Sequence, residues 1–120
     1  MAEWAAYLLI IQGWFYLVTG VWPILHMPSF EAVTGPKTDD WLVKTVGALI
    51  AVVALVLLVA GYRGGVPVEV ALLAAASALA LLAVDLIYVG KRTLSPVYLL
   101  DAAAEIGILA AWAVAWLSRS

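Results

Sequence analysis

Four long runs of apolar residues make up most of the chain, and short polar stretches separate them. The runs cover about residues 4–25, 41–62, 66–89 and 97–117. A helix needs roughly 20 apolar residues to cross a bilayer core of about 30 Å, and each run is that long. The runs are rich in alanine and leucine and do not alternate apolar and polar residues as strands do. They are also too long for the strands of a membrane barrel. The pattern predicts an all-α, four-transmembrane-helix bundle in one domain.

The connections indicate how these helices follow one another. Arg63-Gly64-Gly65 is so short that the second and third helices must be antiparallel neighbours, which predicts an up-down-up-down order. The only long connection is the loop 26–40, which is rich in proline, glycine, serine and threonine. The first run lacks a positively charged segment before it, so we expect a retained span rather than a removed signal peptide.

The composition indicates that lipid surrounds most of the chain, and it excludes several kinds of partner and cofactor. Of 120 residues, 67% are hydrophobic and only 12% are charged, and the mean hydropathy is +1.11. A soluble fold of this size could not bury so much apolar surface. The net charge of −2 without a basic patch speaks against nucleic acid as a partner. The absence of cysteine excludes disulfides and thiolate metal sites, and a single histidine excludes a bis-histidine haem. Paired Glu-x-x-His motifs are also missing, so we expect neither a metal nor another cofactor.

Polar side chains gather in one half of the predicted bundle. We call the face with loops 26–40 and 90–96 side B, and the face with both termini and the 63–65 turn side A. Seven residues near side B or near mid-depth are candidate ligand-binding residues: Gln12, Tyr16, His26, Lys44, Asp85, Tyr88 and Tyr98. Asp101 and Glu105 lie in the same half and are the candidate catalytic residues if the protein is an enzyme. The side A half offers few such groups inside the bilayer.

The fourth run shows which way its polar residues should point. Tyr98, Asp101 and Glu105 are spaced i, i+3, i+7 and therefore share one helix face. A carboxylate facing hydrocarbon costs about 2.5–3.5 kcal/mol or more at mid-helix, so this face should turn inward. Ala103, Gly107, Ala111 and Ala115 recur every four residues on roughly the opposite face, where small side chains let another backbone approach closely. That neighbour is expected in the same bundle or in a second subunit.

Asp85, Asp101 and Glu105 should therefore share a small space beneath side B. Carboxylates at close range repel one another when ionised, and Lys44 is the expected counter-ion within the membrane. Acids inside a membrane indicate a functional site by default. The leading hypothesis is a polar pocket that binds a membrane lipid or another amphipathic small molecule, with Asp101 or Glu105 as acid/base if it reacts. The alternative is that the acids only pair with Lys44 and tyrosine hydroxyls and fix the helix register.

The segment from Trp22 to Gly47, with its Trp-Pro-x-x-His end and the Thr34-Gly35-Pro36-Lys37 turn, resembles small four-helix bacterial membrane proteins of uncharacterised function. This resemblance implies a four-helix membrane fold and a bacterial inner-membrane location, and it implies no activity. The architecture is also similar to the sterol-isomerase-like superfamily, whose carboxylates gather inside one half of a four-helix bundle and act on lipids or sterols. If residues are matched only by their depth in the bundle, the carboxylates of that superfamily correspond to Asp85, Asp101 and Glu105.

Two other function classes stay open. A structural or accessory subunit would use the small-residue stripe and the loop 26–40 to bind a larger membrane protein or a second copy. A proton-coupled small transporter would resemble the small multidrug transporters in length, but Gln12 stands in the first helix, where those proteins carry a glutamate. Side B has more lysine and arginine than side A, which predicts that loops 26–40 and 90–96 face the cytoplasm.

Overall fold

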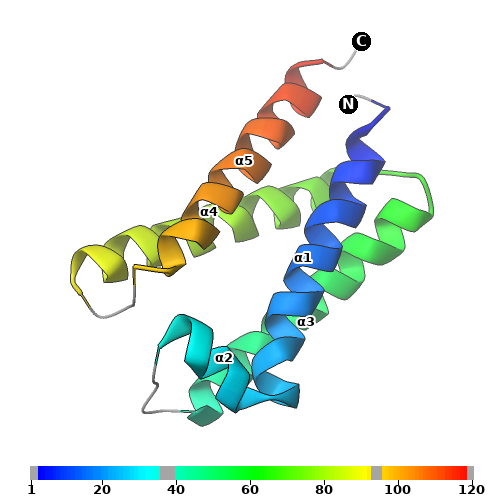
Figure 1. Cartoon of the computed structure of the whole chain (residues 1–120). Coiled ribbons are helices and arrows are strands. Elements are labelled where there is room, and N and C mark those ends of the chain that lie inside the picture. Colours follow the sequence, from blue (N-terminus) through cyan, green and yellow to red (C-terminus); the bar gives the residue numbers. More distant parts are fainter. Residues whose placement is uncertain (1–2, 36–39, 93–95, 119–120) are drawn as a thin grey trace.

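The computed structural model describes residues 3–35, 40–92 and 96–118, and all regular structure in these ranges is helical. The helices are α1 (Ala5–Leu25), α2 (Met27–Thr34), α3 (Asp40–Tyr62), α4 (Val68–Gly90) and α5 (Tyr98–Leu117) (Figure 1). Four of them, α1, α3, α4 and α5, are long and apolar enough to cross a membrane. The all-α fold and the four long apolar helices are confirmed, and each helix boundary lies within two residues of its predicted position.

The expected loop 26–40 contains a short helix, α2, that the hydropathy pattern did not reveal. His26 leaves the helical conformation at the end of α1, and its side chain accepts a hydrogen bond from the backbone N–H of Ser29. Pro28 lies in the first turn of α2, where a missing N–H costs little. Residues 36–39, which include part of the predicted Thr34–Lys37 turn, lie outside the described residues, as do residues 93–95 of the loop 90–96.

Helices α1 and α3 form the most extensive interface of the protein. They run antiparallel, since Gly13 lies against Leu58 and Gly20 lies against Gly47. A Cβ atom built on Gly20 would lie 2.6 Å from the carbonyl oxygen of Gly47, so the two backbones touch there. Glycine at both positions is what permits this approach, as in other closely packed membrane helices.

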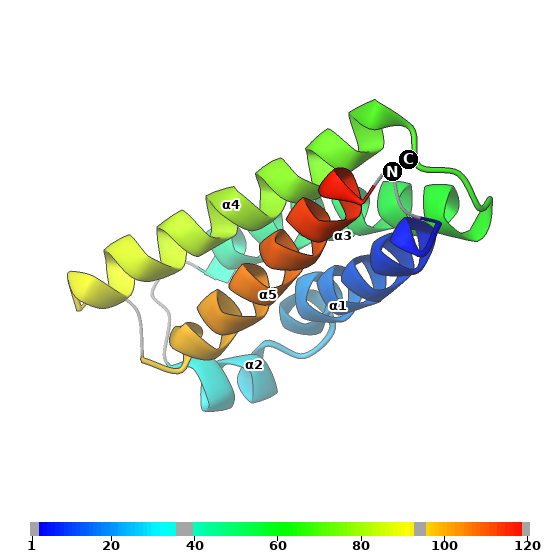
Figure 2. The same cartoon turned by 90° about the horizontal axis from the view of Figure 1, so that it is seen from above.

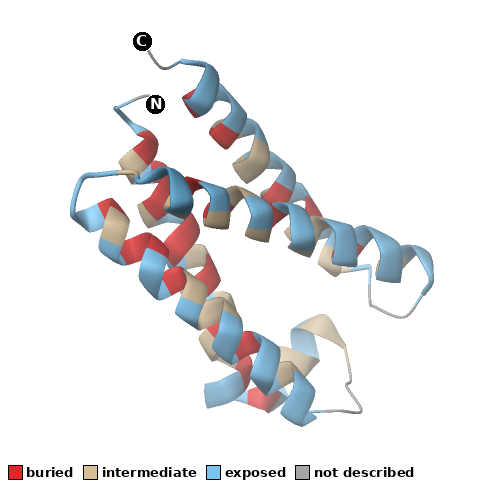
Figure 3. Ribbon diagram, turned by 180° about the vertical axis from the view of Figure 1, so that it is seen from behind, coloured by how far each residue is buried: buried red, intermediate tan, exposed pale blue. Residues whose placement is uncertain are grey.

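Helices α4 and α5 form a second pair, and α5 also contacts α1. Viewed from above, α5 lies between α4 and α1 (Figure 2). Figures 1 and 3 show the end of α4 lying away from α2 and the start of α3, so the two pairs diverge towards side B. That the four helices cross a membrane in an up-down-up-down order stays a prediction.

The outer surface is apolar along the length of the helices. Large side chains such as Ile11, Val18, Leu49, Leu72 and Ile106 are more than half exposed. Figure 3 shows buried residues confined to the inner faces where helices meet. A soluble protein would not expose so many apolar side chains together, so these faces are suited to lipid.

Candidate functional site

Three acidic side chains from α4 and α5 lie together inside the protein. Glu105 is fully buried, Asp85 is 5% exposed and Asp101 is half-buried. Asp101 is close enough to interact with the side chains of both Asp85 and Glu105. The inward orientation of the Tyr98–Asp101–Glu105 face is therefore confirmed, whereas a ligand-binding role for these residues stays a prediction.

Two carboxylate oxygens of this acidic cluster (Asp85, Asp101 and Glu105) lack a donor. Asp85 Oδ2 and Glu105 Oε2 are buried and accept no hydrogen bond from any residue in the described ranges. Two ionised carboxylates cannot hydrogen-bond to each other, because neither carries a proton to donate. A buried acceptor left without a donor costs about 1–3 kcal/mol, and more when it is charged. A proton on one of the carboxyl groups, or a hydrogen-bond donor from outside the protein, would satisfy these oxygens.

Helix α1 supplies polar groups that extend the acidic cluster towards mid-depth. The Tyr16 hydroxyl donates to Glu105 Oε1 at 2.7 Å, and both side chains are completely or almost completely buried. Gln12 lies one helical turn before Tyr16 and donates through Nε2 to the carbonyl oxygen of Ala74 at 2.9 Å. A polar line therefore runs from α4 through Gln12 and Tyr16 to the acids.

Trp112 is a member of this line that sequence reasoning did not single out. Its indole Nε1 donates to Gln12 Oε1 at 2.8 Å, and the side chain is 5% exposed. The signal was available, because Trp112 lies seven residues after Glu105 and continues the same helix face.

The structure brings together five of the predicted site residues, Gln12, Tyr16, Asp85, Asp101 and Glu105, and leaves His26, Lys44 and Tyr88 outside the cluster. His26 caps α2 at the end of α1, with Nδ1 2.7 Å from Ser29 Oγ. Tyr88 is exposed, with Lys91 Nζ 5.7 Å from its ring centroid. Tyr98 is half-buried in the first turn of α5.

Lys44 does not act as the expected counter-ion. It is exposed near the start of α3 and forms no ion pair within the part of the chain that the structure describes. The reason is the divergence of the two helix pairs: the start of α3 packs beside the end of α1 and lies away from the end of α4. Among the described residues, the groups that act on Asp85 and Glu105 are other acids and Tyr16, and none is a lysine, arginine or histidine.

The small-residue stripe of α5 does not form one continuous packing face. Ala103 and Gly107 are exposed, Ala111 is half-buried and Ala115 is buried. A four-residue step exceeds one helical turn by about 40°, so three steps rotate the stripe through roughly a third of a turn. The first two positions consequently face outward, and the last faces the bundle.

The acidic cluster combines buried and half-buried carboxyl groups. Within the described ranges, no group of three or more histidine, cysteine, aspartate or glutamate side chains is placed to hold a metal. The cluster contains two buried acceptors and one half-buried acid beside them.

Comparison of this chain with protein-family models, with curated proteins and with solved structures found no match.

Proposed function

We propose that this membrane protein binds an amphipathic small molecule whose positively charged, hydrogen-bond-donating head contacts the acidic cluster. The observation that carries the proposal is the pair of buried oxygens without a donor, Asp85 Oδ2 and Glu105 Oε2. A ligand with a protonated amine or a comparable head would supply the missing donors. Charge-assisted hydrogen bonds of this kind are about twice as strong as neutral ones.

The surroundings of the cluster favour an amphipathic ligand over a freely soluble one. The acids lie on helices whose remaining surface is almost entirely apolar. A molecule that reaches them from the membrane leaves its apolar part in lipid and loses only the hydration of its head. Asp101 is the half-buried member of the cluster, so it is the acid that an approaching head meets first.

Each residue then has a distinct part in this proposal. Tyr16 occupies Glu105 Oε1 and fixes the carboxylate, which leaves Oε2 for the ligand. Asp85 and Asp101 supply further negative charge. If the bound molecule is also transformed, the reaction is proton transfer, with Glu105 or Asp101 as the acid/base.

The protein is proposed to lie in the bacterial inner membrane, with loops 26–40 and 90–96 in the cytoplasm.

Glu105→Gln tests the site with dodecylammonium as the probe. The amide keeps an acceptor for the Tyr16 hydroxyl, so the fold should be retained, but it places an NH₂ group or a neutral oxygen where the ligand needs a carboxylate. A charge-assisted hydrogen bond contributes about 1.5–3 kcal/mol, so affinity should fall about tenfold or more. The measurement is the thermal unfolding midpoint of protein in maltoside micelles as the probe is titrated, since a ligand stabilises the state that it binds.

Glu69→Gln is the matched control, because it removes an equal charge from an exposed position in the first turn of α4. It should leave the response to the probe unchanged. Neutral dodecanol should stabilise the native protein far less than dodecylammonium. Equal responses in the native protein and in Glu105→Gln, or equal responses to the two probes, would count against the site.

A structural or accessory subunit is the second candidate function, and the outer face of α5 favours it. Gly107 is exposed, and a Cβ atom built there would meet nothing within 4 Å, so a partner helix has room to approach. Purification from native membranes followed by mass spectrometry separates the two candidates. A co-purifying amine-bearing molecule lost in Glu105→Gln supports the ligand site, whereas a stoichiometric protein lost in Gly107→Leu supports the subunit.

A further inference from the structure

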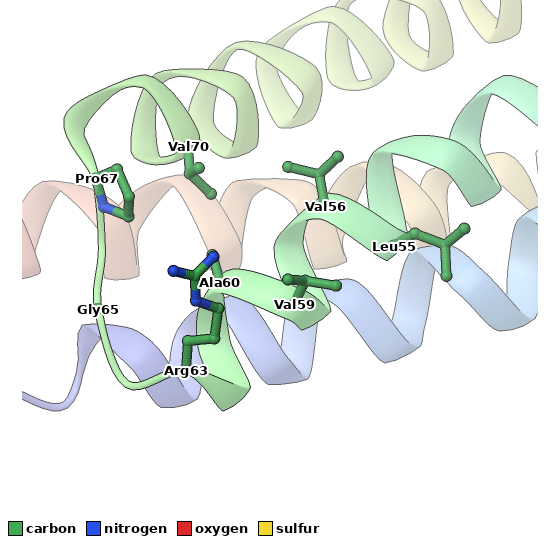
Figure 4. A pocket seen from close by; sticks show the side chains of 8 residues that line it. All are labelled: Leu55, Val56, Val59, Ala60, Arg63, Gly65, Pro67 and Val70. Atoms are coloured by element: carbon green, nitrogen blue, oxygen red, sulfur yellow. The ribbon is translucent and has the colours of Figure 1, made fainter.

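An apolar groove opens between α3 and α4 near side A, away from the acidic cluster. It has a volume of about 500 Å³, within the roughly 300–1,000 Å³ of small-molecule sites. Figure 4 shows Val56, Val59 and Ala60 on one side and Pro67 and Val70 on the other. Helices α3 and α4 contact each other far less than α4 contacts α5, which leaves this space open along the membrane-facing side.

One positive charge lies at the end of this groove. Arg63 follows directly after α3, and its guanidinium points into the space between the two walls (Figure 4). Among the residues that line the groove it is the only charged one. It is exposed and forms no ion pair with any part of the chain that the structure describes. The groove thus combines hydrocarbon walls with a cation at the level where a transmembrane span ends.

We propose that this groove binds an anionic phospholipid, with an acyl chain between α3 and α4 and the phosphate on Arg63. Valine, leucine, alanine and proline side chains match a hydrocarbon chain and offer it no polar competitor. The planar guanidinium binds phosphate oxygens through two parallel hydrogen bonds. Basic groups between transmembrane helices recognise anionic head groups by the same chemistry. The acyl chain also restores the van der Waals contacts that α3 and α4 do not make with each other.

The test is native mass spectrometry of the full chain in maltoside micelles with dioleoyl-phosphatidylglycerol or dioleoyl-phosphatidylcholine. We expect a stoichiometric phosphatidylglycerol adduct, favoured over phosphatidylcholine by about fivefold, the effect of one basic residue at a membrane surface. Arg63→Gln should reduce phosphatidylglycerol occupancy to the level of phosphatidylcholine. Lys91→Gln removes the same charge from an exposed position outside the groove and should leave the preference intact.

A second variant tests the groove independently of the charge. Val59→Trp keeps Arg63 and fills the space with an indole ring, so it should lower the occupancy of both lipids. Arg63→Gln and Lys91→Gln with identical lipid preferences would overturn the proposal, as would full occupancy in a folded Val59→Trp protein. A dimer of this chain that forms in place of the lipid adduct, or competition by inorganic phosphate, would overturn it as well. Glu105→Gln should not change the adduct, which separates this site from the acidic cluster.

Discussion

Gly20→Ala is expected to destabilise the protein by about 1–3 kcal/mol, the usual cost of forcing extra volume into a packed interface. The new methyl carbon would lie 2.6 Å from the carbonyl oxygen of Gly47 and 2.9 Å from the backbone nitrogen of Ala51. Both neighbours are backbone atoms of α3, so a side-chain rotation cannot relieve the overlap. Helices α1 and α3 must separate, and the most extensive interface of the protein loses contacts along its length.

The experiment compares two glycine-to-alanine substitutions in transmembrane helices. Gly107→Ala adds the same methyl group where no atom lies within 4 Å, and alanine favours a helix over glycine by up to about 1 kcal/mol. Gly107→Ala should therefore be neutral or stabilising. Unfolding by dodecyl sulfate in maltoside micelles, followed by circular dichroism, measures both free energies. A Gly20→Ala protein as stable as Gly107→Ala would contradict the close approach of α1 and α3.

Gln12→Leu is the second substitution for which we expect a large effect. It removes the donor to the Ala74 carbonyl and the acceptor for the Trp112 indole, both inside the bundle. Hydrogen bonds between membrane helices contribute about 0.6 kcal/mol on average and up to about 1.7. A buried donor left unpaired costs about 1–3 kcal/mol, so the unpaired Trp112 N–H should dominate. The total loss should be about 2–4 kcal/mol in the same unfolding measurement.

A double substitution separates the unpaired indole from other effects of the leucine. Trp112→Phe removes the N–H, so Gln12→Leu and Trp112→Phe together leave no unpaired donor at this point. The combined loss should be smaller than the sum of the two single losses, because the residues share one interaction. Strict additivity would indicate that the Gln12–Trp112 hydrogen bond contributes little to stability.

The two proposed sites use opposite halves of the molecule and opposite charges. The acidic cluster lies between α1, α4 and α5 in the side B half, where its oxygens need a donor. The groove lies between α3 and α4 near side A, where Arg63 is the proposed contact for an anionic phosphate. The groove is open because α3 and α4 contact each other little, whereas the acidic cluster forms where α1 meets the α4–α5 pair.

Several features of the site followed from the sequence because they are local to one helix. The inward turn of Asp101 and Glu105 follows from their three- and four-residue spacing and from the cost of placing a carboxylate in lipid. The same spacing includes Trp112, which lies seven residues after Glu105. The helix α2 was not predicted, because eight residues are too few for a clear periodic signal and its start depends on the His26 cap.

Hydropathy and helical periodicity by themselves determined the all-α fold, the four spans and the buried face of α5, because a bilayer penalises every exposed polar group in the same way. Only the tertiary structure decided which helices pair, that Gln12 and Tyr16 join the acids, that Lys44 stays apart and that a groove opens beside Arg63. Packing between apolar helices in lipid has no hydrophobic driving force. It depends instead on steric fit, as between Gly20 and Gly47, and on single hydrogen bonds between distant residues, and neither leaves a periodic pattern in the sequence.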